Sequence, residues 1–459
     1  MVSKKTKFYY GLGDLSSNIL FGAISFYLLY FMINVGGLTP YLAGIVFMVA
    51  RIWDAVTDYL MGRISDRTKS KYGKRRIYML FGAIPFGFTF ILLWLTPDTA
   101  DQTLRFLYYT LVYMLYNTAW TIVYIPYNAL TANITNDYDE RTSLNTVRII
   151  MANVGLLLGA ALFALFSDGV ESLFYQYFGS LKLAYAMSGI VFGLIAGFTM
   201  LLCAYKTKEK YDNSEENRFG FFQTLKQFFK LKEFRNTTLY YLFSMIGFDV
   251  VMAVFIFLVN DSLGFSGGDE SMLFVALPLV VAISSAIIWD KLSAKYSKYK
   301  VYAAAAVYIS VCLSLCIFIP AQSYFALGLV CVLVGFGMSA IQILPYASIP
   351  DVVEVDEYYH HVRREGSYYG IMSLMYKLAS GLSIALVSWI LELADYVEDA
   401  PVGYVQSAEA LFAIRLIIGV IPGIIFLTSI IFAFRTNITR ERFNKIKAEL
   451  TLRKSNKGE

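Results

Sequence analysis

The sequence predicts an all-α membrane protein with twelve transmembrane helices, arranged as two halves of six. Of the 459 residues, 57% are hydrophobic and only 16% are charged, against about 25% charged in an ordinary soluble domain. Apolar stretches of about 20 residues, the length that crosses a bilayer, recur along the whole chain. The two sides of these stretches also differ in charge, which predicts how they thread through the membrane.

The apolar stretches are joined by short polar connections. They lie at 8–34, 41–61, 77–96, 104–130, 143–167, 183–205, 237–259, 272–289, 301–320, 323–346, 367–392 and 409–434. The basic start MVSKKTK leads directly into the first stretch without a small-residue cleavage site, so this stretch is expected to remain as a helix. The four cysteines all lie inside predicted spans without a CxxC motif, and we interpret them as apolar packing residues.

The lysines and arginines predict the orientation. If the N-terminus is cytoplasmic, 33 of the 39 basic residues fall in cytoplasmic segments, whereas the opposite loops, such as PDTADQT and ADYVEDA, are acidic or neutral. This is the positive-inside pattern, and it predicts a multi-pass protein of the cell (inner) membrane with both termini in the cytoplasm. The net charge of +5 therefore reflects topology, and we expect no nucleic-acid partner.

The two halves resemble each other. IPYNAL at 125–130 is echoed by LPYASI at 344–349, and each is followed by an acidic loop. Parallel repeats of six spans are typical of the major facilitator fold, in which the substrate site lies between the halves near the bilayer midplane. The predicted units are an N-terminal bundle at 1–205, a cytoplasmic linker with an interfacial helix at 206–235, a C-terminal bundle at 236–434 and a basic tail at 435–459.

The second predicted span carries three charges in the sequence ARIWDAVTDYLMG. Arg51, Asp54 and Asp58 have the spacing i, i+3, i+7, which places them on one face of a helix. Each costs about 2.5 to 3.5 kcal/mol at the centre of a span, so such residues usually face a cavity and have partners. Two carboxylates one turn apart suit Na⁺ or H⁺, and Thr57 and Thr121 could add hydroxyl oxygens. The alternative is a structural clamp between Arg51 and one aspartate.

Two further basic residues lie inside predicted spans. Lys377 is expected in the middle of the eleventh span, where its ammonium could pair with the aspartates of the second span when no cation is bound, making cation and substrate binding interdependent. Packing against a carboxylate is the alternative. Arg148, near the start of the fifth span, is either a gate or substrate residue or a member of the inner belt of charges.

The fourth span carries a stripe of aromatic and amide side chains. Trp120 and Tyr124 lie on one stripe with Tyr116, and Asn128 lies one turn further. Flat aromatic rings beside hydrogen-bonding groups suit the faces of sugars, although in a chain with 35 tyrosines such a stripe can equally serve packing. Asp14, Asn18 and Asp249 are further polar residues inside spans, and whether the two aspartates face the cavity is left open.

Four segments together resemble the glycoside–pentoside–hexuronide:cation symporters, of which melibiose permease is the best-known member. They are RIWDAVTDYLMGRISDRTKSKYGKRR, IPYNALTANITNDYDERTSLNTVR, LPYASIPDVVEVDEY and RREGSYYGIMSLMYK. The resemblance implies a twelve-helix facilitator fold that couples sugar uptake to Na⁺, Li⁺ or H⁺. It also implies that Asp54, Asp58 and Thr121 belong to the cation site, and that Arg148 and Lys377 are functional basic residues.

This chain departs from melibiose permease at several positions. Thr57 stands where that protein has an asparagine, while Asn18 and Tyr124 replace two sugar-binding aspartates, and Asn128 and Gln342 replace two tryptophans. Because two acids are lost while Arg148 and Lys377 are kept, the cavity is less negative. One hypothesis is therefore an anionic sugar such as a hexuronide.

The predicted function is secondary active transport. We expect cation-coupled symport, with H⁺ or Na⁺, of a sugar, glycoside or hexuronide by alternating access. The alternative is a carrier of lysophospholipids or other amphiphiles with the same fold. No Ser/His/Asp set, metal cluster or glycine-rich phosphate loop supports an enzyme, so we expect no enzymatic activity, no cofactor and no required protein partner.

Overall fold

The computed structural model describes residues 2–135, 138–209, 230–265, 267–360, 365–401, 404–436, 438, 442–443, 445–446 and 448–450. The predicted interfacial helix of the linker and most of the predicted basic tail lie outside the described residues. Within the described residues, the chain is helical throughout, apart from loops and one isolated bridge between Gly169 and Gly267.

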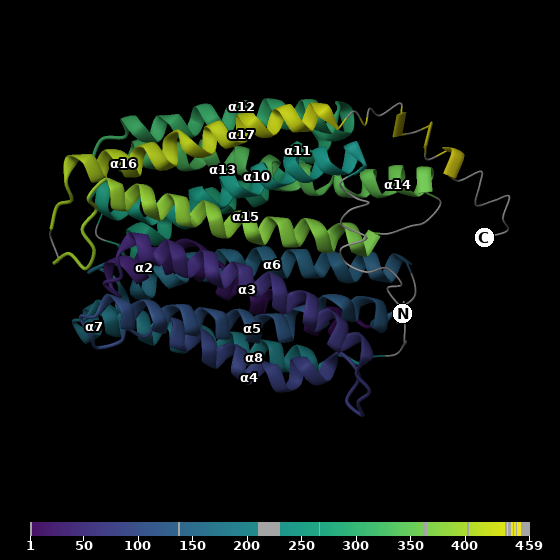
Figure 1. The fold of residues 1–459 in the computed structure, drawn as a ribbon, viewed down its shortest axis with the longest axis horizontal. Helices are drawn as coiled ribbons and strands as arrows, with labels where there is room; N and C mark the ends of the chain where they lie inside the picture. The colour runs from purple at the N-terminus through teal and green to yellow at the C-terminus, as the bar shows by residue number, and fades with distance from the viewer. Residues whose placement is uncertain are drawn as a thin grey trace.

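Two groups of helices lie side by side, as Figure 1 shows. The first group consists of α1 (Lys4–Ala23), η1 (Ile24–Leu28), α2 (Leu29–Asn34), α3 (Pro40–Arg67), α4 (Arg76–Leu93), α5 (Gln102–Ile134), α6 (Tyr138–Ser167), α7 (Leu173–Phe178) and α8 (Leu181–Lys206). The second consists of α10 (Lys232–Phe257), η2 (Leu258–Ser262), α11 (Asp269–Lys295), α12 (Lys298–Ser314), η3 (Leu315–Phe318), α13 (Tyr324–Tyr346), α14 (Ile349–His360), α15 (Glu365–Leu393), α16 (Ala408–Gly419) and α17 (Ile421–Arg435).

Each of the twelve apolar stretches predicted from the sequence coincides with a helix or with consecutive helical segments. Eleven of the described helical segments are long and apolar enough to cross a membrane. The stretch that falls outside this group is α5, which has 33 residues and therefore the necessary length. Its tyrosines and Asn117 lower its mean hydropathy, and the Asn117 side chain donates a hydrogen bond to the backbone carbonyl of Ala50 in α3.

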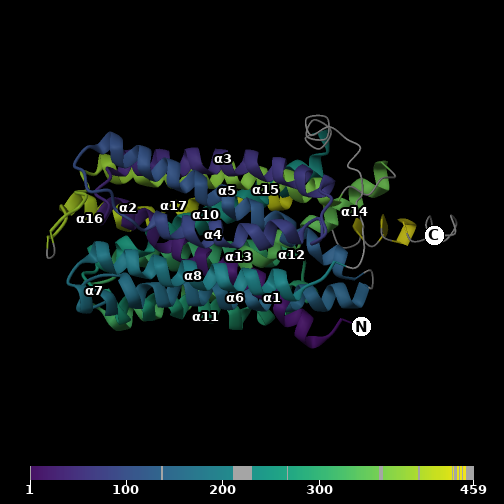
Figure 2. The same ribbon diagram turned by 90° about the horizontal axis from the view of Figure 1, so that it is seen from below.

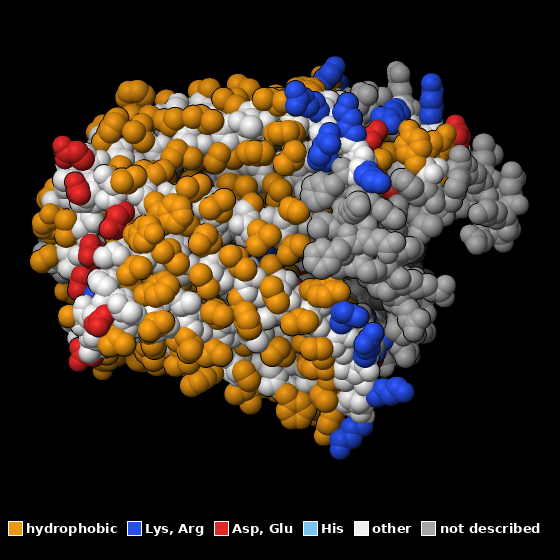
Figure 3. Space-filling view, in the orientation of Figure 1, with side chains coloured by type: hydrophobic (Ala, Val, Ile, Leu, Met, Phe, Trp, Pro, Cys, Tyr) orange, Lys and Arg blue, Asp and Glu red, His pale blue; other side chains and the backbone are white. Residues whose placement is uncertain are grey.

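Charge divides the molecule into two ends. In Figure 3 the lysines and arginines gather at one end, the aspartates and glutamates gather at the other, and hydrophobic side chains cover the surface between them. We call the end with the loop 68–75 the basic end and the end with the loop 168–172 the acidic end. A hydrophobic belt between two charged ends is the surface expected of a protein that spans a bilayer.

Small residues let helices of the first half approach closely. A Cβ atom placed on Gly159 of α6 would lie 2.0 Å from the carbonyl oxygen of Ile19 in α1, and one on Gly22 would lie 2.7 Å from the carbonyl oxygen of Leu156. These backbones are therefore in direct contact. In a bilayer the hydrophobic effect does not drive helices together, so close packing at small residues is what holds them to one another. The contact fixes α1 against α6, and both helices contribute to the cavity described below.

The two groups meet through symmetric pairs of helices. α3 packs against α15 and α6 packs against α11, so the second spanning helix of each half contacts the fifth of the other. A third contact joins η1 and α2 to α10. Figure 2 shows α3 and α15 on one side of the molecule and α6 and α11 on the opposite side.

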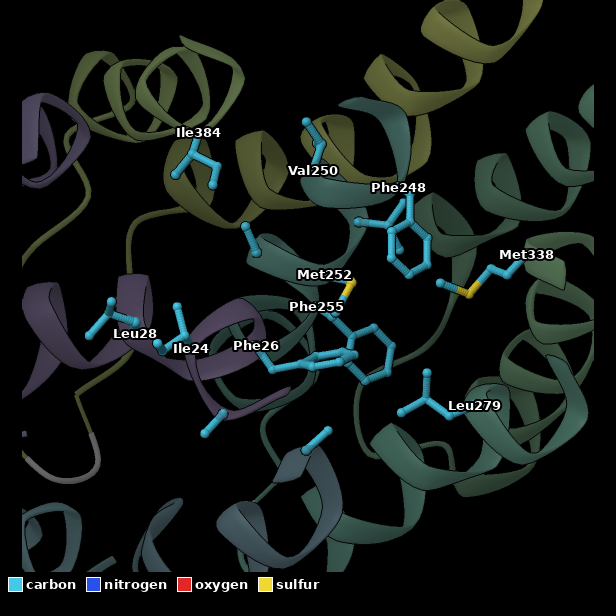
Figure 4. Close-up of a cluster of buried hydrophobic side chains, with 14 of the residues drawn as sticks. Ile24, Phe26, Leu28, Phe248, Val250, Met252, Phe255, Leu279, Met338 and Ile384 are labelled. Atoms are coloured by element: carbon cyan, nitrogen blue, oxygen red, sulfur yellow. The ribbon is translucent and has the colours of Figure 1, made fainter. Parts of the chain in front are cut away.

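A hydrophobic cluster fills the centre of the interface between the halves. In Figure 4, Phe26 of η1 lies beside Phe255 of α10, and their ring centroids are 6.4 Å apart in an edge-to-face arrangement. Met252, Met338 and Leu279 surround this pair. These side chains are all buried, so the centre of the interface is packed with apolar groups.

At the acidic end the halves are joined by hydrogen bonds around Asp168, which follows α6 and is fully buried. The side-chain amide of Asn260, in η2 of the second half, donates to both carboxylate oxygens of Asp168, at 3.0 and 3.1 Å. The backbone amide of Gly268 donates to the Asp168 carbonyl oxygen at 2.5 Å. We call this set of contacts the outer latch.

Replacing Asn260 with alanine is expected to weaken the outer latch and to shift the protein towards a state open at the acidic end. Loss of a hydrogen bond to a buried carboxylate costs about 1.5–3 kcal/mol, so the shift in equilibrium is about 10- to 150-fold. The measurement uses a cysteine in place of Ser373, an exposed residue of the central cavity. If the protein opens at the acidic end, this cysteine should react faster with a membrane-impermeant maleimide added at that end. The native cysteines of the described chain are buried and give little background.

The matched control is Gln176→Ala. Its side chain makes exposed hydrogen bonds to Glu171 within the first half and leaves the outer latch intact. Equal labelling rates for Asn260→Ala and Gln176→Ala would show that the latch does not hold the acidic end closed.

Candidate functional site

The centre of the α3–α15 contact holds three charged side chains from both halves. The ammonium of Lys377, in α15, lies 2.8 Å from Oδ2 of Asp54 and also contacts Oδ2 of Asp58, both in α3. Lys377 and Asp54 are buried, with side chains 8% and 3% exposed, and Asp58 is 18% exposed. A charge buried in this way is stabilised only by close partners, and here each charge has one. We call these three residues and Thr121 the cation cluster.

The hydroxyl of Thr121 completes the cluster from α5. It lies 2.7 Å from Oδ1 of Asp58 and 3.2 Å from Oδ1 of Asp54. Thr57 contributes less directly, because its hydroxyl donates to the backbone carbonyl of Asp54 at 3.1 Å and lies 3.5 Å from the Thr121 hydroxyl. The two carboxylates thus converge on the Lys377 ammonium, and the Thr121 hydroxyl contacts both carboxylates from the side of α5.

Arg51 is not the partner of these aspartates. Its Nε atom is buried and has no hydrogen-bond partner among the described residues. A Cβ atom placed on Gly381 of α15 would lie 2.8 Å from the Cβ atom of Arg51. The absence of a side chain at Gly381 therefore lets α3 approach α15 here. In this structure the aspartates are held by Lys377, and the clamp with Arg51 that the sequence left open is not formed.

A large cavity lies between the halves and reaches towards the basic end. Its volume is about 1140 Å³. It extends to the start of α6 and the end of α13, where Ile149 and Tyr346 are exposed, so it is open at that end. At the other end, Leu279 belongs both to its lining and to the cluster of Figure 4. The lining is rich in amide and tyrosine side chains, namely Asn18, Tyr124, Asn128, Asn145, Asn153, Tyr241, Gln342, Tyr346 and Tyr376.

Five of the substrate residues predicted from the sequence line this cavity: Asn18, Tyr124, Asn128, Arg148 and Gln342. Lys377 belongs instead to the cation cluster, and Trp120 lies beside it. The Trp120 ring lies 5.0 Å from the Lys377 ammonium, and it stacks on Tyr124 with ring centroids 4.3 Å apart. This stack connects the cation cluster with the cavity.

The stripe on α5 is divided between packing and cavity. Tyr116 is buried, stacks on Phe86 and makes a tilted ring contact with Phe90, both in α4, so it serves packing. Tyr124, two turns further, lines the cavity. Helical periodicity could not separate the two because both lie on the same stripe, and the position of α4 decides which of them is covered.

Arg148 is held by an aspartate that the sequence did not assign to the site. Its Nε lies 2.5 Å from Oδ2 of Asp14, in α1, and its guanidinium also contacts the Oδ1 of Asn128. The hydroxyl of Tyr127 donates to Asp14 at 2.8 Å, and the guanidinium lies over the Tyr127 ring, 4.7 Å from its centroid. Asp14 therefore faces the cavity, and Arg148 is a cavity residue.

Asp249 lies elsewhere, in a small cavity that Arg51 also lines. Its carboxylate accepts hydrogen bonds from the hydroxyls of Ser380, at 2.5 Å, and Tyr376, at 3.0 Å. Tyr376 and Lys377 are adjacent in α15, so this helix contacts carboxylates of both halves through neighbouring residues. The sequence marks Asp249 as a polar residue in an apolar span but could not predict which cavity it faces.

Comparison with known proteins identifies the family. The profile of the family described as MFS/sugar transport protein matches residues 9–440. The chain belongs to this family. Like its other members, it is an integral membrane protein that crosses the bilayer several times, and it is a transporter rather than an enzyme.

Two relatives and one solved structure illustrate the range of the similarity. The chain is 26% identical to YagG of Escherichia coli K12, assigned as a glycoside/cation symporter, over 100% of this chain and 97% of that protein. It is 24% identical to the sodium-dependent lysophosphatidylcholine symporter 1 of Gallus gallus, over 89% of this chain and 82% of that protein. The inward-open xylose transporter XylE of Escherichia coli shares the fold, with a TM-score of 0.63 and 12% identity over 97% of this chain and 99% of that one.

Proposed function

We propose that this protein is a symporter that couples the transport of a sugar or glycoside to a monovalent cation, H⁺ or Na⁺. The observation that carries the proposal is the position of the Lys377 ammonium between Asp54 and Asp58, across the contact between the halves. Names of relatives from bacteria and vertebrates support symport, and the amide- and tyrosine-lined cavity supports a polyhydroxylated substrate.

In the proposed mechanism Lys377 and the coupling cation compete for the same carboxylates. Two carboxylates and one ammonium carry a net charge of −1, which one monovalent cation neutralises. When the cation binds near Asp54, Asp58 and Thr121, the ammonium loses its partners and α15 is released from α3. The stack of Trp120 on Tyr124 would transmit the change to the cavity.

The moving units are proposed to be the bundles 1–205 and 236–434, which rock about the central site. Since lysines and arginines gather at the basic end, we place that end and both termini in the cytoplasm. The structure then corresponds to an inward-open state, closed at the outer side by the outer latch and the Phe26–Phe255 cluster.

The test is uptake by the purified protein in proteoliposomes with imposed Na⁺ or pH gradients and a panel of radiolabelled glycosides. We expect at least one glycoside to accumulate above its external concentration under one of the two gradients, and not without a gradient. Equal uptake with and without both gradients for every transported glycoside would contradict coupling.

A carrier of lysophospholipids is the second candidate, because one wall of the cavity is apolar. Ile149, Leu156 and Leu157 of α6 and Ile283 of α11 line it where these two helices meet, and an acyl chain could lie there. Uptake of a labelled lysophospholipid under a Na⁺ gradient, with no uptake of any glycoside, would favour this candidate over the first.

A further inference from the structure

The charged residues of the central cavity form one ion pair with each other. Of the described residues that line the cavity, Asp14 and Arg148 are the charged ones. Besides the 2.5 Å contact between Arg148 Nε and Asp14 Oδ2, Nη2 of Arg148 lies 3.4 Å from Oδ1 of the same carboxylate. The Arg148 side chain is 16% exposed and that of Asp14 is 6% exposed. The pair is therefore neutral as a unit, and the Arg148 side chain is the more exposed of the two.

The ammonium of the cation cluster is also balanced. The Lys377 ammonium is held by Asp54 and Asp58, and it lies outside the set of residues that line the cavity. An anionic substrate would thus find no cation without a carboxylate partner among the described residues of the cavity. A neutral substrate needs none, since carboxamides such as those of Asn153 and Gln342 can bind its hydroxyl groups.

We propose that the substrate is a neutral glycoside and that Asp14 is the residue that excludes carboxylated sugars. The inference rests on the proposed function and adds the charge class of the cargo. A sugar carboxylate would be drawn to Arg148, which offers a fork of N–H donors. Asp14 already occupies that fork and repels a second carboxylate, so it acts as a specificity residue by negative charge.

Asp14→Asn tests this assignment because asparagine keeps the shape of the side chain and removes its charge. Arg148 keeps its contacts with Asn128 and with the hydroxyl of Thr131 at 3.4 Å, and it then offers an unbalanced positive charge to the cavity. We expect the ratio of uptake of a methyl glucuronide to that of the matched methyl glucoside to rise by at least tenfold. Asp14→Glu, which keeps the charge, should leave this ratio low.

The double variant Asp14→Asn/Arg148→Gln provides the second control. It restores a neutral cavity, so the gain in glucuronide uptake should disappear. Folding of each variant is checked by size-exclusion chromatography, and ligand binding is measured separately by thermal shift in detergent with the glucuronide and the glucoside. For a variant that binds sugars but no longer transports them, the ratio of glucuronide binding to glucoside binding replaces the ratio of uptake.

The possible outcomes separate this inference from the proposed function. If the unaltered protein takes up the glucuronide as well as the glucoside, or if Asp14→Asn leaves the ratio unchanged, the role of Asp14 is overturned while sugar symport stands. If neither sugar binds to or is transported by any of the folded proteins, whereas a lysophospholipid is transported, both proposals fail.

Discussion

Asp58→Asn is expected to abolish uphill accumulation of the substrate. A tenfold gradient of a monovalent cation supplies about 1.4 kcal/mol, which sustains at most about tenfold accumulation if one cation moves with each sugar. Without the Asp58 carboxylate, the cation cluster consists of one aspartate paired with Lys377 and carries no net charge, so it no longer attracts a cation. The ratio of internal to external substrate should therefore fall to about one in proteoliposomes with an imposed gradient.

Exchange distinguishes loss of coupling from loss of the protein. Asp58 does not line the central cavity, so the variant is expected to retain exchange of internal for external substrate. Asp290→Asn is the matched control, because Asp290 is an exposed carboxylate near the basic end of α11. Accumulation by Asp58→Asn at the level of Asp290→Asn would refute the assignment of the cation cluster.

Lys377→Met is expected to make the stability of the protein strongly dependent on the coupling cation. Methionine fills the space but leaves Asp54 and Asp58 buried without their shared ammonium. Removing one partner of a buried ion pair costs about 3–5 kcal/mol. A bound cation would recover this energy, so it should bind the variant at least tenfold more tightly than it binds the unaltered protein.

The measurement is thermal unfolding in detergent over a series of Na⁺ concentrations and pH values. A ligand that binds only the folded state raises the unfolding temperature as its concentration increases. Without the cation, the Lys377→Met variant should therefore unfold at a lower temperature than the unaltered protein. Adding the cation should raise the unfolding temperature of the variant by more than that of the unaltered protein. Lys182→Met, at an exposed position near the start of α8, should respond as the unaltered protein does. An identical response of all three proteins would exclude competition between Lys377 and the cation.

Local sequence patterns predicted the candidate cation cluster better than the candidate substrate cavity. The spacing of Asp54 and Asp58 in a regular helix is enough to place both on one face. Lys377 stands out because an isolated lysine in an apolar span needs a partner. The cavity residues give a weaker signal, because Trp120, Tyr124 and Tyr116 share one stripe and only neighbouring helices decide which of them is covered.

The charges counted in the sequence and the charges placed by the structure favour different substrates. The loss of two acids, with Arg148 and Lys377 kept, favoured an anionic sugar. That reasoning treats each charge separately, whereas the electrostatic effect of a charge depends on its distance from its partner. In the structure, Asp14 lies 2.5 Å from Arg148, although 134 residues separate them in the chain. The pair makes a neutral substrate the better proposal.

The sequence by itself determined that this chain is helical, that it carries twelve apolar stretches and that one side of them is basic. These properties follow from local composition and from the energy of placing charges in lipid, so they need no knowledge of the fold. Only the tertiary structure decided which carboxylate faces which cation. It separated Asp14, which faces the central cavity, from Asp249, which faces a smaller one. The physical reason is that such pairings arise between helices far apart in the chain, whose relative rotation is set by packing.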